Sequence, residues 1–279
     1  MTDSELPLVA FVGRPNVGKS SLVNRLLGEE RVLVHDQPGT TTDPVDTPFT
    51  LLGKPYVLVD TAGVRRKARI EEPTEKIAVS MALAQISRAD VCILVLDGSE
   101  GPTEQEARIA GAIEDGGRAV VIAVNKDDLL GEGTARAARE KTLADDIAER
   151  FPFLPFAEVH FVSAKTGHGV TELILAGRKA WEEHGRRIGT SELNRFFAEV
   201  CETTPPPTFR GKSVRIYYLA QPMAHPPTFV LWANRPELVH HGYRRFLVNQ
   251  LREKFGFAGT PLRVITRRRG KGAKGPKEV

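Results

Sequence analysis

Apolar residues in the first two thirds of the chain form short continuous runs, separated by segments with helical spacing. The runs are Leu8–Val12, Tyr56–Val59, Val91–Leu96, Ala119–Val124 and Val159–Val162. Continuous runs of this length are typical of strands in a parallel sheet that is covered on both faces. The segments with helical spacing are 21–27, 74–86, 104–113, 134–150 and 170–184. The alternation predicts an α/β fold with a doubly wound, mostly parallel sheet over residues 1–185.

The pattern changes near residues 185–189, and the last third of the chain predicts a smaller second domain. We expect a helix over Glu192–Cys201, with Ser191 as its N-cap, and a second helix from Pro236 to about Phe255. The expected strands are Val214–Leu219, Thr228–Trp232 and Leu262–Thr266. This order predicts a small α+β domain over residues 186–266. Residues 267–279 are rich in Gly, Lys and Arg and are expected to form a disordered basic tail.

The composition is typical of a globular protein. Of the 279 residues, 41% are hydrophobic and 27% are charged. No apolar run approaches the length of a membrane-spanning helix, and the first residues lack the basic-then-apolar pattern of a secretory signal. The two cysteines, Cys92 and Cys201, lie far apart in apolar or helical surroundings. We therefore expect a reduced, cytoplasmic protein that is monomeric and does not contact a membrane.

Charge is divided unevenly between the two predicted domains. Residues 186–279 hold 18 lysines and arginines against 6 acidic residues, a balance of +12, whereas residues 1–185 hold 21 against 29, a balance of −8. An acidic half joined to a strongly basic half indicates that the second half meets a polyanion. The alternative is that the basic residues only keep a small domain soluble.

Residues 13–20, Gly-Arg-Pro-Asn-Val-Gly-Lys-Ser, carry the full phosphate-binding loop pattern between a predicted strand and a predicted helix. Gly13 and Gly18 let the backbone turn its N–H groups around an anion, with a helix N-terminus behind them. Lys19 supplies a positive charge to the β- and γ-phosphates, and Ser20 supplies an oxygen to Mg²⁺. An ordinary glycine turn between strand and helix is the alternative.

A second motif, Asn125-Lys126-Asp127-Asp128, follows the predicted strand 119–124. The Asp128 carboxylate can accept hydrogen bonds from both the ring N–H and the exocyclic amine of guanine. Adenine lacks that donor pair, so a buried carboxylate there would reject it. We expect Lys126 to lie along the base and Asn125 to tie neighbouring loops together. A solvated charged turn is the alternative.

Together these segments resemble the translation-factor class of GTPases over residues 8–165. Ser163-Ala164-Lys165 resembles the last guanine motif of that class, in which the Ala164 N–H meets the base oxygen. Asp60-Thr-Ala-Gly63 resembles the motif that holds Mg²⁺ through water and senses the γ-phosphate with the Gly63 N–H. The polar segment Gly28–Thr42 predicts a loop whose Thr41 closes on Mg²⁺, with Thr40 as the competing assignment.

The same resemblance bears on hydrolysis. Many GTPases carry a water-orienting glutamine after the Asp-Thr-Ala-Gly motif, but Val64 stands there in this chain. Asn16 resembles the asparagine that helps to coordinate K⁺ beside the phosphates in a subgroup of these enzymes, where a cation stabilises transition-state charge. A loop-stabilising role for Asn16 is the alternative.

The resemblance assigns three overlapping groups of residues. The nucleotide (GTP or GDP) is expected to contact Gly13, Asn16, Val17, Gly18, Lys19, Ser20, Ser21, Asn125, Lys126, Asp128, Ser163, Ala164 and Lys165. The residues expected to act in hydrolysis are Lys19, Thr41, Gly63 and Asn16. Mg²⁺ is expected at Ser20, Thr41 and Asp60.

Longer stretches narrow the resemblance to one family, the ribosome-assembly GTPases Der (EngA). In the first half these are Asp60–Lys67, Arg88–Asp90, Thr103–Gln105 and Arg108–Gly111; in the second half they are Asn194–Phe197, Pro226–Val230, Asn249–Arg252 and Phe255–Arg263. The chain is similar to the second GTPase domain and the C-terminal KH-like domain of that family. The resemblance implies a GTPase that contacts ribosomal RNA of the large subunit.

Some features depart from the family pattern. Der proteins have two tandem GTPase domains, but this sequence has one phosphate-binding loop. It is open whether the chain is a fragment, an engineered form or a shortened relative. Thr42 stands where the family has arginine, and Asp127 stands where it has tryptophan. The rival function is a GTP-sensing RNA-binding module with negligible turnover.

Three conspicuous features of the second half are interpreted as structural. Gly256-Phe-Ala-Gly259 has the spacing of the GxxG clamp of RNA-binding KH domains, but it carries no basic residue and is expected to cap a helix. No cysteine or carboxylate cluster accompanies His240-His241. Trp232 is expected to pack rather than to stack on a base. The basic tail fits phosphate contact through Arg267, Arg268, Arg269, Lys271, Lys274 and Lys277, or is only a solubilising end.

Overall fold

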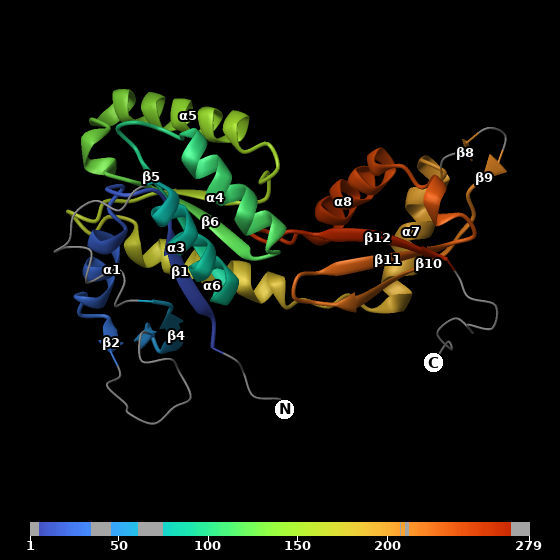
Figure 1. Cartoon of the computed structure of the whole chain (residues 1–279), viewed down its shortest axis with the longest axis horizontal. Helices are drawn as coiled ribbons and strands as arrows, with labels where there is room; N and C mark the ends of the chain where they lie inside the picture. Colours follow the sequence, from blue (N-terminus) through green and yellow to red (C-terminus); the bar gives the residue numbers. More distant parts are fainter. Residues whose placement is uncertain (1–5, 35–45, 61–74, 207, 210–211, 269–279) are drawn as a thin grey trace. The chain divides into compact units, whose positions relative to one another are not determined.

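The computed structural model describes residues 6–34, 46–60, 75–206, 208–209 and 212–268 (Figure 1). The chain divides into two compact units. The first comprises residues 1–183 and 258–261, and the second comprises residues 184–257 and 262–279. Within the described residues, no helix is both long enough and apolar enough to cross a bilayer.

The first unit is built on a seven-stranded sheet with the order β2-β3-β4-β1-β5-β6-β7. Its strands are β1 (Leu8–Val12), β2 (Val32–Val34), β3 (Thr47–Leu51), β4 (Lys54–Leu58), β5 (Val91–Asp97), β6 (Ala119–Asn125) and β7 (Glu158–Phe161). Pairing is parallel from β4 through β1, β5 and β6 to β7, and antiparallel among β2, β3 and β4. The predicted fold class, a mostly parallel α/β sheet, is confirmed.

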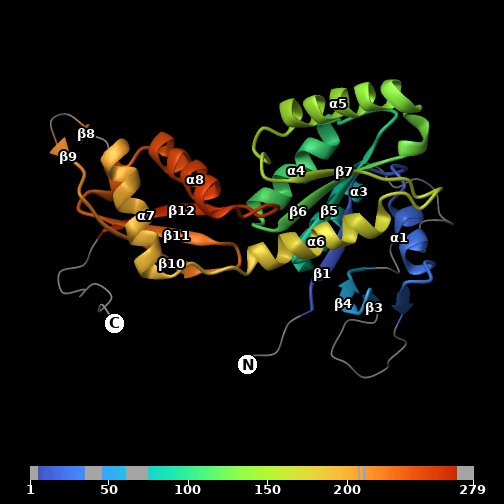
Figure 2. The same ribbon diagram turned by 180° about the vertical axis from the view of Figure 1, so that it is seen from behind.

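Helices cover both faces of this sheet (Figures 1 and 2). They are α1 (Lys19–Leu27), α3 (Glu75–Arg88), α4 (Glu104–Asp115), α5 (Gly133–Arg150) and α6 (Val170–His184), with a short 3₁₀ turn η2 (Asp127–Leu129). Side chains of α1 and α6 share one hydrophobic cluster, and those of α3, α4 and α5 share another. Successive residues of β5 alternate between the clusters, because side chains of a strand point to opposite faces. This is why the central strands are apolar throughout.

The segment Gly28–Thr42, predicted as a loop, contains the strand β2. Val32–Val34 pairs antiparallel with β3, with Val32 opposite Leu51 and Val34 opposite Phe49. Only Val32 of these three is buried, so the strand has little hydrophobic signal of its own. Its backbone hydrogen bonds to β3 make it a strand.

The second unit is a three-stranded sheet with two helices, and the predicted α+β fold is confirmed. Its elements are α7 (Thr190–Thr203), β8 (Thr208–Phe209), β9 (Lys212–Ser213), β10 (Ile216–Met223), β11 (Thr228–Ala233), a 3₁₀ turn η3 (Pro236–Leu238), α8 (His241–Phe255) and β12 (Arg263–Arg268). The strand order is β10-β11-β12, antiparallel and then parallel. Residues from both helices, including Phe196 and Leu251, share a core with Phe229 and Leu231 of β11.

Three local predictions in this unit were wrong. Gly189, not Ser191, occupies the N-cap of α7. The helix expected from Pro236 is interrupted between η3 and α8. Val239 and His240 have extended backbone there, because the Val239 side chain packs in the core with only 4% of its surface exposed. Arg267 and Arg268, expected in a disordered tail, complete β12 by pairing with Trp232 and Ala233. The other tail residues, 269–279, lie outside the described part. The expected helix cap at Gly256 is confirmed, with a φ of 86°.

A buried carboxylate joins α4 to the loop after β1. Glu106 is fully buried, and its Oε2 accepts hydrogen bonds from the N–H and the hydroxyl of Thr103, at 2.8 and 2.7 Å. These contacts form a capping box at the start of α4. The other oxygen, Oε1, accepts from Nε of Arg14 at 3.0 Å. One side chain therefore caps a helix and anchors the loop that contains Arg14.

Glu106→Ala should lower the free energy of unfolding of the first unit by about 2–4 kcal/mol, because it removes the cap and leaves a guanidinium without its buried partner. The measurement is urea unfolding followed by Trp181 fluorescence in a Trp232→Phe background. The matched control is Glu104→Ala, whose side chain is 76% exposed and should cost under about 0.5 kcal/mol. Equal losses in the two variants would contradict the proposed anchor.

Candidate nucleotide-binding site

The predicted site residues that the structure describes gather at the carboxyl ends of neighbouring parallel strands. The phosphate-binding loop follows β1, residues 125–128 end β6 and begin η2, and residues 163–165 follow β7. Strand order places β1, β5, β6 and β7 next to one another. Open α/β sheets bind ligands at this edge because the loops there lie beyond the hydrogen-bonded ladder.

Glycine is required at two positions of the phosphate-binding loop. Gly13 has a φ of 148°, and a Cβ there would lie 2.4 Å from the carbonyl oxygen of Val95. Gly18 has a φ of 95°, and its Cβ would lie 2.2 Å from Nδ2 of Asn125. Both positions combine left-handed backbone with close neighbours, so the loop can wrap tightly. Because α1 begins at Lys19, directly after this turn, the positive end of the helix faces the loop and fits an anion such as a phosphate.

Lys19 lies across the phosphate-binding loop. Its Nζ donates to the carbonyl oxygens of Gly13, at 2.8 Å, and of Arg14. The ammonium is thus held by neutral acceptors inside the turn where a phosphate would bind. Ionic acceptors bind an ammonium more strongly than carbonyl oxygens do, so a phosphate can take over these bonds. The residues present therefore fit a phosphate group.

Asn125 connects the phosphate-binding loop to the loop after β7. Its Nδ2 donates to the carbonyl oxygen of Val17 at 2.8 Å, and its Oδ1 accepts from the N–H of Ala164 at 3.1 Å. The side chain is only 2% exposed. Asn125 therefore ties the two loops together, as we expected from the sequence. The Ala164 N–H, which we expected to meet the base oxygen, donates to Asn125.

The Asp128 carboxylate is bound to the loop after β7. Its Oδ1 accepts from the Ser163 hydroxyl at 2.6 Å, and Nζ of Lys165 lies 3.7 Å from its Oδ2. The Ser163 hydrogen bond, aided by Lys165, lowers the pKa of Asp128. Arg25 of α1 steadies the same loop by donating to the carbonyl oxygens of Ala164 and Lys165. An ionised acceptor is therefore fixed in place at neutral pH, as recognition of guanine by its donor pair requires.

Sequence reasoning missed Asp97, the last residue of β5. This carboxylate is only 2% exposed and lies opposite Asn125 in the sheet. Its Oδ2 lies 2.5 Å from Nζ of Lys126, and its Oδ1 accepts from the N–H and the hydroxyl of Ser99. Burial opposes ionisation of Asp97, but the hydrogen bonds from Lys126 and Ser99 outweigh it and lower the pKa. A carboxylate at the end of a buried strand was the available signal.

Lys126, which we expected along the base, is therefore held by Asp97. Its backbone is left-handed, with a φ of 65°. The ion pair fixes the direction in which the aliphatic part of Lys126 runs, and that part can still lie along a base.

Asp127, noted in the sequence only as a departure from the family, is 2% exposed. Its Oδ2 lies 2.6 Å from Nη2 of Arg136 and 2.9 Å from Nδ1 of His168. These contacts join η2 to α5 and to the loop that contains Lys165. The charged residue is therefore accommodated by two cationic or protonatable partners instead of by apolar packing.

The metal and switch residues are only partly described. Asp60 has a left-handed φ of 57°, its N–H donates to Asp46 at 3.0 Å, and its Oδ2 accepts from Gln85 at 3.2 Å. Ser20 is the second residue of α1, and Asn16 is exposed with a φ of 65°. Thr41, its competitor Thr40, Gly63 and Val64 lie outside the described residues. In the described part, no three His, Cys, Asp or Glu side chains cluster as a metal site.

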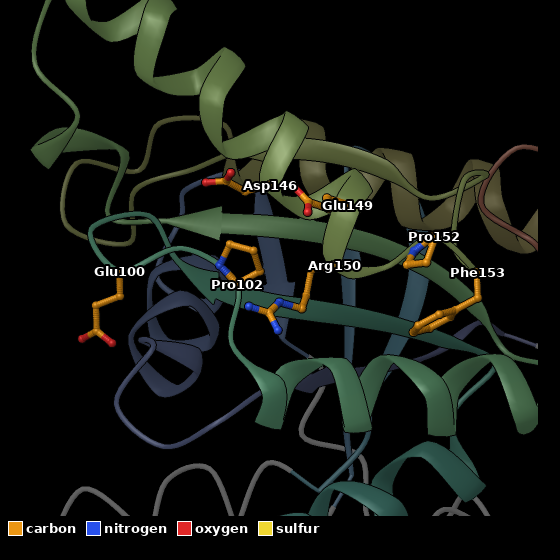
Figure 3. Close-up of a pocket in the computed structure, with 7 residues that line it drawn as sticks. All are labelled: Glu100, Pro102, Asp146, Glu149, Arg150, Pro152 and Phe153. Atoms are coloured by element: carbon orange, nitrogen blue, oxygen red, sulfur yellow. The ribbon is translucent and has the colours of Figure 1, made fainter.

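A hollow of about 710 Å³ lies elsewhere on the first unit (Figure 3). Its lining residues are Glu100, Pro102, Asp146, Glu149, Arg150, Pro152 and Phe153. Three carboxylates and one guanidinium make this surface acidic, which disfavours a triphosphate. None of the predicted nucleotide residues lines it.

Family comparisons match both parts of the chain. Residues 8–126 match the model of 50S ribosome-binding GTPases, and residues 78–183 match that of the elongation factor Tu GTP-binding domain. Residues 187–267 match the C-terminal KH-domain-like family of EngA bacterial GTPases.

Two similar proteins, both named GTPase Der, align with more than 90% of the chain. The chain is 48% identical to GTPase Der of Caldanaerobacter subterraneus subsp. tengcongensis over 268 residues, which cover 96% of this chain and 60% of that protein. It is 50% identical to GTPase Der of Moorella thermoacetica over 262 residues, covering 93% and 59%. The chain thus spans about 60% of the length of these relatives. A crystal structure of Era with MgGDPNP and nucleotides 1506–1542 of 16S ribosomal RNA has a TM-score of 0.46 and 21% identity, covering 95% of this chain and 93% of that one.

Asp97→Asn should weaken binding of a fluorescent guanosine diphosphate about tenfold at neutral pH, because a neutral amide cannot hold the Lys126 ammonium as an ion pair does. Because the pKa of Asp97 is lowered in the folded state, the stability of the parent protein depends on pH. The stabilisation from Asp97 is present above the unfolded-state pKa of about 3.9 and is lost as pH falls through the lower folded-state pKa. Glu104→Gln, an exposed carboxylate on the neighbouring helix, is the control and should leave affinity unchanged. An Asp97→Asn affinity equal to the parent's would rule out this role.

Proposed function

We propose that this chain, which carries a GTPase domain and the KH-like domain of the Der (EngA) family, is a GTP-binding and GTP-hydrolysing switch. It acts in assembly of the large ribosomal subunit. The observation that carries the proposal is the position of the Asn125 amide between the phosphate-binding loop and the loop beside Asp128. This amide thereby fixes the phosphate-binding loop relative to the Asp128 carboxylate, which is suited to guanine.

The phosphate side supplies positive charge and positioning. Lys19 exchanges its loop carbonyls for the β- and γ-phosphates, while N–H groups at the start of α1 bind phosphate oxygens. Ser20, Asp60 and Thr41 hold Mg²⁺, which supplies charge stabilisation to the phosphates. The Gly63 N–H senses the γ-phosphate. In hydrolysis the water oxygen bonds to the γ-phosphorus as the bond to the bridging oxygen breaks, giving GDP and phosphate.

The base side supplies selection. Asp128 accepts from the two adjacent donors of guanine, Lys126 lies along the ring, and the 163–165 loop borders the base. Ser163 keeps Asp128 ionised and oriented, so these hydrogen bonds are available without reorganisation.

Val64 leaves the chain without the side chain that orients water in many GTPases. We propose that Asn16 helps to hold K⁺ beside the phosphates, where the ion supplies positive charge to the transition state. The exposed position of Asn16 and its left-handed backbone in the phosphate-binding loop support this role. Without such help the same chain would act as a GTP sensor with negligible turnover.

The second unit supplies the ribosomal partner in this proposal. Its excess of basic residues fits RNA phosphates, and its KH-like match supports an RNA contact. We propose that a cytoplasmic monomer binds the large subunit and its rRNA, with no membrane contact. GTP hydrolysis measured with and without K⁺ and large-subunit particles tests the whole proposal. No hydrolysis under any of these conditions, with GTP still bound, would favour the sensor.

Asp128→Asn should weaken GTP binding by about 2–4 kcal/mol, because the lost carboxylate removes charge-assisted hydrogen bonds to the base. It should improve binding of xanthosine triphosphate, whose base presents an acceptor at that edge. Competitive nucleotide titration measures both. Asp145→Asn, an exposed carboxylate of α5, is the control. Retention of parental GTP affinity by Asp128→Asn would show that another group selects the base.

Hydrolysis should be faster in KCl than in NaCl at equal ionic strength, because K⁺ held by Asn16 would supply positive charge to the transition state. Asn16→Ala should flatten the difference and leave nucleotide affinity largely intact. Asn24→Ala, on the exposed side of α1, should keep the potassium dependence. Phosphate release at the same rate in both salts for the parent protein would refute the potassium site.

A further inference from the structure

The three-stranded sheet of the second unit has a face that its own helices do not cover. Residues that pair directly across strands share a face, and Phe229, Leu231 and Ala233 of β11 belong to the core under α7 and α8. The intervening residues of β11 therefore point away from the helices. The register adds their partners from β10 and β12. The face, called the open face below, therefore carries Tyr218, Ala220, Met223, Thr228, Val230, Trp232, Arg263, Ile265 and Arg267. Thr228 and Val230 on β11 are buried among these neighbours, and the other residues of the face are half-buried or exposed.

Two aromatic rings lie together on the open face. Tyr218 pairs with Trp232 across the antiparallel strands, and their ring centroids are 5.8 Å apart with planes 24° apart. Both side chains are half-buried, so each keeps part of its surface accessible. We expected Trp232 to pack, but it is not part of the core cluster of this unit. A stacked, partly accessible aromatic pair can receive a further planar group.

The charge on this face has one sign. Arg267 is the β12 residue opposite Trp232, and Arg263 lies opposite Thr228 on the same face; both are exposed. Strands β10, β11 and β12 contain no aspartate or glutamate. Arg268, next in the chain, belongs to the other face and pairs with Glu237. The open face thus presents guanidinium groups beside aromatic rings.

We propose that the open face binds unpaired, single-stranded RNA, with bases stacked on Trp232 and Tyr218 and phosphates on Arg267 and Arg263. The inference rests on the proposed function and identifies the RNA surface of the second unit. Flat aromatic rings recognise bases whatever their identity, because every base has a π-face. Double-stranded RNA hides its base faces within the stack, so it fits this surface poorly. A protein partner would have to supply acidic side chains for the two arginines, since the three strands of this sheet contain none.

The stacking contact can be measured directly. Trp181→Phe leaves Trp232 as the single tryptophan of the chain. A short uridine oligomer should quench Trp232 fluorescence on binding, because the base stacks on the indole ring. An abasic ribose-phosphate oligomer of equal length keeps the phosphates but should bind more weakly and leave the fluorescence unchanged. Equal quenching by both oligomers would overturn the stacking role.

Variants separate the aromatic and the ionic contributions. Trp232→Leu should weaken binding of the uridine oligomer about tenfold, and Trp232→Phe should restore most of the loss because it retains a π-face. Arg267→Gln should reduce the slope of log affinity against log salt by about 0.7, the value for one phosphate contact on a single strand. Arg268→Gln removes the same charge from the opposite face and should change the slope less. Equal slopes for these two variants would contradict the proposed face.

The outcomes distinguish this inference from the function on which it rests. If large-subunit particles bind the parent and all four variants equally, the open face is not the RNA surface, although the proposed function stands. If the parent binds neither the oligomer nor the particles, the RNA part of the proposed function fails. If Trp232 fluorescence instead changes only with protein concentration, the face pairs with a second copy of the chain, and the inference is wrong.

Discussion

The Asn125 side-chain amide is the contact on which the geometry of the nucleotide site depends. It uses both of its polar atoms, one toward the phosphate-binding loop at Val17 and one toward Ala164 in the loop after β7. Because the amide is buried, loss of either bond would leave a polar group without solvent, at a cost of about 1–3 kcal/mol. Gly18 passes so close to this amide that a Cβ would overlap it. The two loops are therefore set relative to each other before any ligand binds.

Buried carboxylates form a supporting layer around this contact. Asp97 holds Lys126, Glu106 holds Arg14 of the phosphate-binding loop, and Asp127 holds Arg136 and His168. Each would be costly alone in the interior, and each has a cationic or protonatable partner as well as a local structural role. The arrangement orients cationic side chains near the site while neutralising part of their charge. Buried carboxylates with cationic or protonatable partners thus support both the phosphate-binding loop and the segment 125–128.

The two faces of the sheet in the second unit carry different kinds of side chain. Its core side holds apolar residues under α7 and α8, and its five described acidic residues are confined to α7, η3 and α8. Its other side combines an aromatic pair with arginines. A strand can serve both purposes because adjacent side chains point in opposite directions, as Arg267 and Arg268 do.

The sequence alone determined the α/β and α+β fold classes, most helices and strands, and the residues at the ends of β1, β6 and β7, because apolar periodicity and glycine-bearing motifs are local properties. It also located Asn125 and Asp128. It did not locate Asp97, because the available signal, a carboxylate at the end of an apolar strand, does not reveal the Lys126 partner until β5 lies beside β6. The strand β2 and the break before α8 depended on backbone pairing with β3 and on burial of Val239. Likewise, the place of Trp232 opposite Tyr218 and Arg267 followed from strand register. Contacts between residues distant in the chain are set by how elements pack, and only the tertiary structure decided them.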